Sequence, residues 1–194
     1  MNILFVLAHP EPTSFNGQLV ATGKDHFEAQ GHHVEVSDLY ALDFDPVEKA
    51  ANYPDRINEK EFAPLAEQRH AYKEGILAPE IQQQIEMLER ADLVIFQFPI
   101  WWHSVPAMLK GWCDRVFVSG GLYTSKMRYD NGYFRGKRAM CSVTSGAPGE
   151  AFVAGGRGGE LDLIDPAQHE IVMEGQETRR RVFDKMTQLF DQYR

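Results

Sequence analysis

Cysteine is scarce in this sequence, and its scarcity excludes several classes of protein. Cys113 and Cys141 are the only two cysteines, and they lie far apart in apolar surroundings. Disulfide-rich secreted domains and zinc-binding modules both need more cysteines at close spacing. We therefore expect two reduced, buried thiols, no metal site, and a protein that works in the cytoplasm.

Positive charge and long hydrophobic runs are also in short supply. Lys and Arg total 20 against 28 Asp and Glu, and the formal net charge of -8 would repel a nucleic-acid backbone or an anionic membrane surface. No stretch approaches the ~18 apolar residues that a membrane span needs. The apolar run at residues 3–8 lacks a preceding basic cluster, unlike a signal peptide. These absences argue against a nucleic-acid partner and against stable membrane insertion.

What remains is the composition of an ordinary folded protein. The chain has 194 residues, of which 43% are hydrophobic and 25% are charged, as in typical globular proteins. This length suits one domain better than two. We therefore expect a single domain over residues 1–194.

Short apolar segments alternate with helical patterns along the chain. Residues 41–76 are the exception, because they show no clear periodicity and are typical of an excursion around an active site. Strands alternating with helices predict an α/β fold with a doubly wound parallel sheet, covered on both faces. The predicted strands are 2–8, 33–38, 92–98 and 138–144, and the predicted helices follow residue 16 and cover 79–90, 108–118 and 170–193.

Three loops of this fold should converge on one site. In open parallel sheets the ligand binds beyond the carboxyl ends of the strands. The loops at residues 9–16, 99–106 and 144–149 each follow a predicted strand. We call them the first, second and third loops.

The first loop offers hydroxyl groups, an amide and backbone N–H groups at the start of a helix. A helix N-terminus favours an anion, so a phosphate group fits there. The loop has neither a GxGxxG nor a Walker glycine pattern, so the usual dinucleotide and nucleoside-triphosphate motifs are not satisfied. Plain helix capping by Thr13 or Ser14 would explain the same residues without a ligand.

The second loop places Trp101, Trp102 and His103 at the end of a buried strand. A planar ligand such as a flavin ring would stack on these rings, and backbone N–H groups would stabilise charge on it. Alternatively, the tryptophans cover a core or a subunit interface and His103 is a structural histidine.

The third loop is rich in small residues, which let a ligand approach the backbone closely. A simple turn explains this composition equally well. The coincidence of an anion pocket, aromatic rings and small residues at three strand ends nevertheless indicates flavin binding.

At these residues the chain resembles the NAD(P)H:quinone oxidoreductases, the DT-diaphorase group of flavodoxin-like proteins. The resemblance spans nearly the whole chain. It rests on AHPEPTSFN at 8–16, AYKEGILAPEI at 71–81, ADLVIFQFPIWWHSVPAMLKGWCDRVF at 91–117, and YFRGKRAMCSVTSGAP at 133–148.

The resemblance implies a flavin site, a catalytic set and an assembly. FAD is the implied flavin, because the AYKEG segment occurs in the longer members that use FAD, with FMN as the alternative. The implied catalytic residues are Trp102, His103 and Tyr123, and the family forms homodimers in which Tyr123 and its neighbours cover the partner's substrate pocket. The implied cofactor-binding residues are His9, Thr13, Ser14, Phe15 and Asn16 at the phosphates, Pro99, Ile100, Trp101, Trp102 and His103 along the isoalloxazine, and Thr144, Ser145, Gly146 and Ala147 at its polar edge.

Two departures from the family pattern concern the C-terminal part. Phe152 and Gly158 stand where mammalian members carry a Tyr and a His that assist charge balance. The family also continues into a further helix and a fifth strand that this sequence does not offer. We therefore predict four strands in the order 2-1-3-4, with residues 138–144 as an exposed edge that the terminal helix or a dimer partner must cover.

The sequence thus predicts an enzyme that transfers hydride from NAD(P)H through a bound flavin to a quinone, by a ping-pong mechanism. Two alternatives stay open: a flavin-binding regulatory or ancillary subunit of a membrane transporter, and a shortened, inactive family member. The physiological acceptor and the preference between NADH and NADPH do not follow from the sequence.

Overall fold

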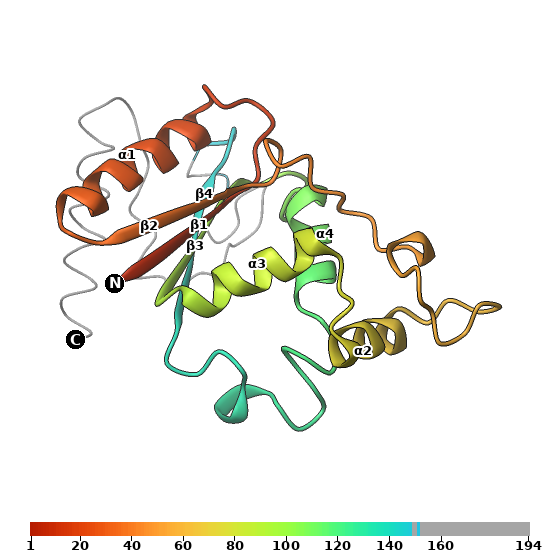
Figure 1. Cartoon of the computed structure of the whole chain (residues 1–194). Coiled ribbons are helices and arrows are strands. Elements are labelled where there is room, and N and C mark those ends of the chain that lie inside the picture. The colour runs from red at the N-terminus through yellow and green to blue at the C-terminus, as the bar shows by residue number, and fades with distance from the viewer. Residues whose placement is uncertain (149–150, 152–194) are drawn as a thin grey trace.

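The computed structural model describes residues 1–148 and residue 151. Its sheet has four parallel strands in the order β2-β1-β3-β4 (Figure 1). This order confirms the prediction from the sequence. The strands are β1 (Asn2–Leu7), β2 (His33–Asp38), β3 (Leu93–Pro99) and β4 (Arg138–Thr144). Three predictions fall outside the described residues: the absence of a fifth strand, the terminal helix, and the positions of Phe152 and Gly158.

Four α-helices accompany the strands within residues 1–148, and their ends follow local sequence signals. Ser14 caps the first helix, and proline occupies the first position of the second and third, where its missing N–H has no helical partner to lose. Gly75 ends the second helix at a φ of 67°, a conformation that favours glycine. The helices are α1 (Phe15–Ala29), α2 (Pro64–Glu74), α3 (Pro79–Arg90) and α4 (Ala107–Val116), with short 3-10 turns η1 (Ala50–Asn52) and η2 (Tyr129–Asn131).

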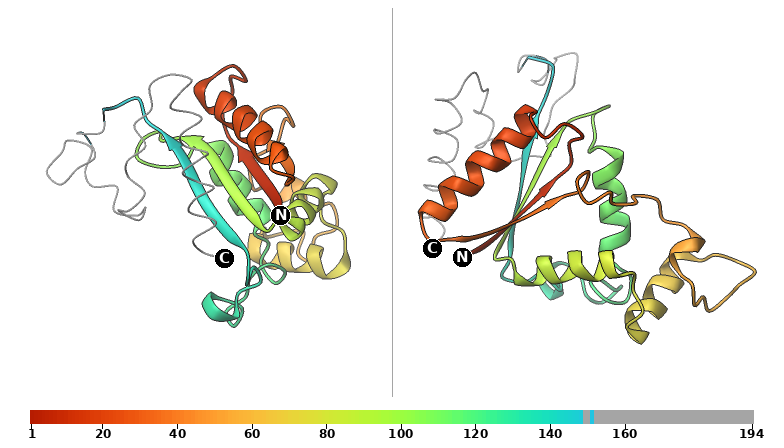
Figure 2. Two further views of the ribbon diagram at one scale, coloured as in Figure 1. Left: turned by 90° about the vertical axis from the view of Figure 1, so that its left-hand side faces the viewer. Right: turned by 45° about the horizontal axis from the view of Figure 1, so that its top comes forward.

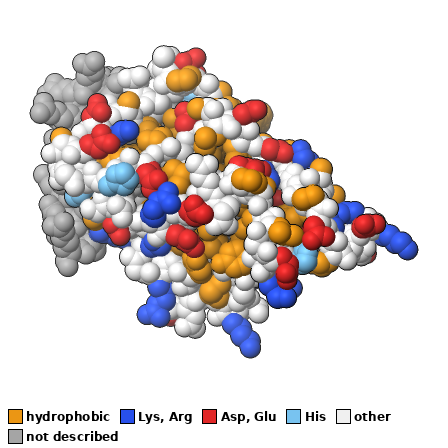
Figure 3. All heavy atoms as spheres, in the orientation of Figure 1, with side chains coloured by type: hydrophobic (Ala, Val, Ile, Leu, Met, Phe, Trp, Pro, Cys, Tyr) orange, Lys and Arg blue, Asp and Glu red, His pale blue; other side chains and the backbone are white. Residues whose placement is uncertain are grey.

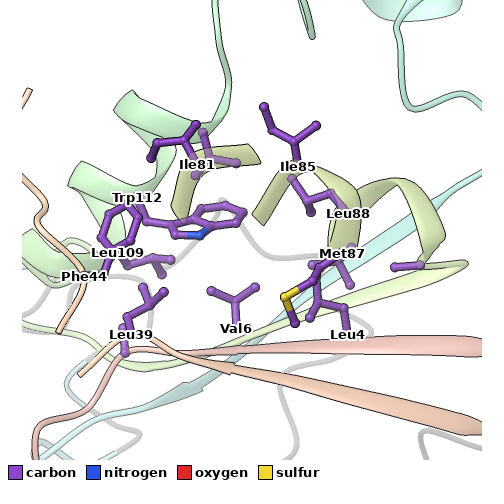
Figure 4. Packing of buried hydrophobic residues seen from close by; sticks show 14 of the residues in the cluster. Leu4, Val6, Leu39, Phe44, Ile81, Ile85, Met87, Leu88, Leu109 and Trp112 are labelled. Atoms are coloured by element: carbon purple, nitrogen blue, oxygen red, sulfur yellow. The ribbon is translucent and has the colours of Figure 1, made fainter. Parts of the chain in front are cut away.

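The helices cover both faces of the sheet, as the right-hand view of Figure 2 shows for α1 on one side and α3 and α4 on the other. Alternate strand residues supply the two cores. Ile3, Phe5 and Ile95 pack with α1, while Leu4 and Val6 pack with Trp112 and the apolar side of α3 (Figure 4). The apolar runs of β1 and β3 are therefore buried on both faces.

The segment between β2 and α3, which has no clear periodicity in the sequence, contacts α4 through the buried Arg115 and through Gln68, whose Nε2 donates to the Asp114 carbonyl oxygen at 2.9 Å. Arg115 donates from Nη1 to the Asp45 carbonyl oxygen at 2.7 Å and from Nη2 to Glu80 at 3.2 Å. Its Nε lies 3.8 Å from Glu48 Oε2. Most of this segment is irregular, with α2 as its one α-helix, and its ordering depends on tertiary contacts rather than on a local pattern.

The prediction of two buried thiols is wrong for Cys141. Both cysteines are free, with Cys113 half-buried and Cys141 exposed. Cys141 lies on β4, an edge strand of the sheet that the structure describes, where Ala139 is also exposed. The predicted exposed edge at residues 138–144 is thus present among the described residues.

Charges of both signs are interspersed over the face shown in Figure 3. Exposed pairs such as Arg90 with Glu35 at 2.8 Å and Lys110 with Asp114 at 2.5 Å tie neighbouring side chains together. Among the described residues, the helices are too short or too polar to span a membrane, and no group of three or more potential ligand side chains is arranged to hold a metal ion.

Candidate functional site

The three loops named from the sequence meet at the carboxyl edge of the sheet. They leave β1, β3 and β4, and the second and third are joined directly where Ile100 N donates to the Thr144 carbonyl oxygen at 2.8 Å. Parallel pairing in register brings Pro99 beside Thr144. The predicted convergence of these loops is therefore confirmed by the backbone.

A chain of side-chain hydrogen bonds, which we call the amide link, joins β3, the first turn of α1 and the end of β4. Gln97 Nε2 donates to Asn16 Oδ1 at 2.8 Å. Asn16 Nδ2 in turn donates to Thr144 Oγ1 at 2.9 Å. Gln97 is 1% exposed and Asn16 4% exposed, so the link is shielded from water. The Oδ1 and Nδ2 atoms of the Asn16 amide are thus bonded to β3 and to the end of β4, and the role of Asn16 toward a phosphate stays a prediction.

The first loop is closed by its own polar groups. Ser14 Oγ accepts from Gly17 N at 3.1 Å and so caps α1, which confirms the capping reading for Ser14. The Glu11 carboxylate accepts from Thr13 N at 2.9 Å and from Thr13 Oγ1 at 2.6 Å. These bonds, led by the one from the Thr13 hydroxyl, lower the pKa of Glu11. An anion therefore already interacts with Thr13, which shows that the loop presents donors suited to negative charge.

A tight turn at the start of the second loop displays the aromatic rings. Trp101 and Ser104 pair through two backbone bonds of 3.1 Å, and the residues between them have φ values of 53° for Trp102 and 59° for His103. Positive φ at both central residues is the geometry of a two-residue hairpin that normally favours Asn and Gly. Holding Trp and His there costs about 1 kcal/mol or more per residue. Such strain at a strand end is typical of a functional site.

The rings on this turn face outward rather than into the core. Trp102 is 96% exposed and Trp101 is 42% exposed. The Trp101 ring lies beside His9 of the first loop, with centroids 6.2 Å apart. Trp102 therefore covers no core among the described residues, which removes one of the structural alternatives for it. His103 is also exposed and forms no hydrogen bond with the described residues.

The third loop exposes its small residues. Ser145 Oγ accepts from Ala147 N at 3.1 Å, which forms a small turn. A Cβ added at Gly146 would meet nothing within 4 Å. The small side chains of residues 145–147 are exposed, so the backbone is accessible to a bound molecule.

Tyr123, a predicted site residue, lies outside the three loops, and Phe15 packs against the core beneath α1. After α4 the chain returns to the amino edge of the sheet before it enters β4 (Figure 1). Tyr123 lies in this return and accepts from Gly120 N through its carbonyl oxygen at 2.9 Å. It therefore cannot complete the site at the carboxyl edge of its own sheet.

Sequence reasoning missed three residues of the site. Gln97 was read only as part of a strand, although it is the polar member of the alternating set Leu93, Ile95 and Gln97. Nothing in the sequence distinguishes Glu11 from other polar loop residues, because its role depends on the contacts with Thr13. Glycine is required at position 17 by a contact that the sequence does not show. A Cβ at Gly17 would lie 2.0 Å from the Pro12 carbonyl oxygen. Of these three residues, only Gln97 has a signal in the sequence, because it is the polar residue within the apolar strand β3.

The residues present fit a flavin, by the chemistry of the donors and the space beside them. The first loop supplies hydrogen-bond donors at Thr13, which bind the Glu11 carboxylate in this structure. Phosphate groups need donors of the same kind. Trp101 and Trp102 supply exposed aromatic faces, and the surroundings of Gly146 are open. One end of the site thus suits an anion and the other a flat ring.

Comparison with known proteins agrees with this architecture. A family model described as the flavodoxin-like fold matches residues 1–173. The NAD(P)H dehydrogenase [quinone] 1 of Cavia porcellus is 41% identical over 162 residues, which are 83% of this chain and 59% of that protein. The ribosyldihydronicotinamide dehydrogenase [quinone] of Pongo abelii is 41% identical over 169 residues, 86% of this chain and 73% of that protein. The chain thus spans less than two thirds of the first of these relatives.

A solved structure from Klebsiella pneumoniae, described as a candidate quinone reductase, superposes with a TM-score of 0.78 at 38% identity, over 87% of this chain and 69% of that one. The Streptococcus mutans protein Smu.1420 superposes with a TM-score of 0.66 at 29% identity, over 97% of this chain and 98% of that one. By sequence and by fold, the chain belongs to the flavodoxin-like family, within the group of the NAD(P)H:quinone oxidoreductases.

Proposed function

We propose that this chain is a flavin-dependent oxidoreductase that transfers two electrons from NAD(P)H to a quinone. The observation that carries the proposal is the strained turn at Trp102 and His103, which holds exposed aromatic rings beside two loops suited to a flavin. The names of the relatives at 41% identity support the same reaction class. FAD is the proposed flavin, with FMN as the alternative.

Each part of the site has a task in this reaction. The first loop would hold the phosphate groups through Thr13 and the N-terminus of α1. Trp101 and Trp102 would orient flat rings and exclude water from one side of them. A bound flavin would supply the chemistry of accepting and donating hydride, while the protein positions the reactants. The exposed imidazole of His103 would hold a proton for the reduced acceptor.

We also propose that the working form is a homodimer. Tyr123 is half-buried and belongs to the segment between α4 and β4, which returns to the amino edge of the sheet. A two-fold assembly would let it reach the site of a second copy. The test is light scattering of the purified protein together with Tyr123→Phe, which should alter the Michaelis constant for quinone in a dimer. A monomer with full activity would contradict the assembly.

The decisive experiment measures NAD(P)H oxidation by the purified full chain loaded with FAD or with FMN, with a quinone and no other protein. Initial rates at several concentrations of both substrates should give parallel double-reciprocal lines, as ping-pong kinetics require. Loaded protein with no quinone-dependent oxidation of NADH or NADPH would refute the enzyme and favour the ancillary-subunit alternative. A cytoplasmic location is part of the proposal, and the two free thiols are consistent with it.

A further inference from the structure

Gln97 is a buried polar residue on the face of β3 that packs against α1. Leu93 and Ile95 precede it at alternate positions of β3, and both pack against α1. Strand alternation places Gln97 on that same face, and it is 1% exposed. Burying an amide costs free energy unless it is hydrogen-bonded, so an apolar side chain would be the simpler solution here. The position of this amide therefore needs a reason.

The backbone of Gln97 lies at the centre of the site's framework. It pairs with Leu7 of β1 on one side and with Ser142 of β4 on the other. Its carbonyl oxygen accepts from Ala8 N at 3.0 Å, at the point where the first loop begins. Its side chain then reaches Asn16 at 2.8 Å, and Asn16 reaches Thr144 at 2.9 Å. One residue thus contacts the beginning and the end of the first loop.

We propose that Gln97 is a positioning residue that, through the amide link, sets the distance between the first and third loops and thereby the affinity for the flavin. Donation from Gln97 Nε2 fixes which end of the Asn16 amide is the acceptor. The Asn16 Nδ2 group is then directed to Thr144, at the start of the third loop. A ligand that contacts both loops binds more tightly when their spacing is fixed beforehand. This inference rests on the proposed function.

The chain offers a matched control in Gln84, a second buried glutamine. Gln84 is 2% exposed, and its Oε1 accepts from Ser37 Oγ at 2.6 Å and from Trp112 Nε1 at 2.9 Å. It belongs to α3, on the opposite face of the sheet from α1. Gln97→Leu and Gln84→Leu therefore both remove buried hydrogen bonds, but only the first touches the amide link.

The test measures the flavin dissociation constant of the full chain by quenching of flavin fluorescence. Gln97→Leu should weaken flavin binding roughly tenfold, the equivalent of about one buried hydrogen bond, and Gln84→Leu should leave it unchanged. Thr144→Val breaks the link at its half-buried end and covers the case in which Gln97→Leu does not fold. Because both variants release Asn16, the double variant Gln97→Leu/Thr144→Val should lose less than the product of the single effects, whereas Gln84→Leu/Thr144→Val should show the product.

Hydrogen exchange on the flavin-free protein gives a second readout that does not depend on the proposed function. Gln97→Leu should speed exchange of amides in both loops, and Gln84→Leu should not. Equal flavin affinity in Gln97→Leu and wild type, or an equal loss in Gln84→Leu, would overturn the proposal while leaving the enzyme intact. Wild-type protein that binds neither FAD nor FMN would overturn both the proposed function and this role of the link.

Discussion

Gly17→Ala should destabilise the protein and weaken flavin binding, because there is no room for a methyl group at this position. The added Cβ would lie 2.0 Å from the Pro12 carbonyl oxygen, and real Cβ atoms essentially never approach within 3.0 Å of another atom. The first loop would have to move by about 1 Å or more, at an overpacking cost of about 1–3 kcal/mol. The helix propensity of alanine recovers at most about 1 kcal/mol. We expect a net loss of roughly 1–2 kcal/mol in the free energy of unfolding.

Gly111→Ala provides the control for this prediction. Gly111 lies in α4, where a Cβ would approach the Pro46 carbonyl oxygen to the same 2.0 Å. Urea denaturation should show a similar destabilisation of both variants, while flavin titration should show weaker binding only for Gly17→Ala. Wild-type stability in Gly17→Ala would refute the close contact. Equal flavin affinities in the two variants would refute the assignment of the first loop to the phosphates.

Three further predictions concern other parts of the molecule. Trp102→Ala should raise the Michaelis constant for quinone or lower turnover by more than it lowers flavin content, and steady-state rates matching wild type would show that this ring is dispensable. Burial raises the pKa of Glu48, so the Glu48 carboxyl keeps its proton to a higher pH in the folded state than in the unfolded chain. Its contribution to the free energy of unfolding therefore falls as the pH rises from the unfolded pKa through the folded pKa. The stability advantage of Glu48→Gln over wild type should therefore grow between about pH 4 and about pH 7 in chemical denaturation; an advantage that stays constant would contradict the shift. Cys113 should react slowly with iodoacetamide at about pH 8, because burial raises its pKa to about 11, and rapid labelling seen by mass spectrometry would argue against its burial.

The limits of the strands were predictable from local patterns in the sequence, and their order was predictable from the resemblance to flavodoxin-like proteins. The apolar runs 2–8, 33–38, 92–98 and 138–144 match the observed strands to within one residue at either end. Buried parallel strands need side chains that are apolar on both faces, so each strand appears in the sequence as a short continuous apolar run. The convergence of the three loops followed from the parallel sheet alone.

Only the tertiary structure decided how the site is held together. The bonds from Gln97 to Asn16 and from Asn16 to Thr144 join residues 81 and 128 positions apart, so they depend on strand order and register rather than on any local pattern. The separation of Tyr123 from the carboxyl edge depends on the path after α4. The positive φ values at Trp102 and His103 are uncommon for residues other than glycine, and no local pattern in the sequence indicates them. Local sequence specifies elements through side-chain periodicity, whereas contacts between elements arise only once the sheet has set their spacing.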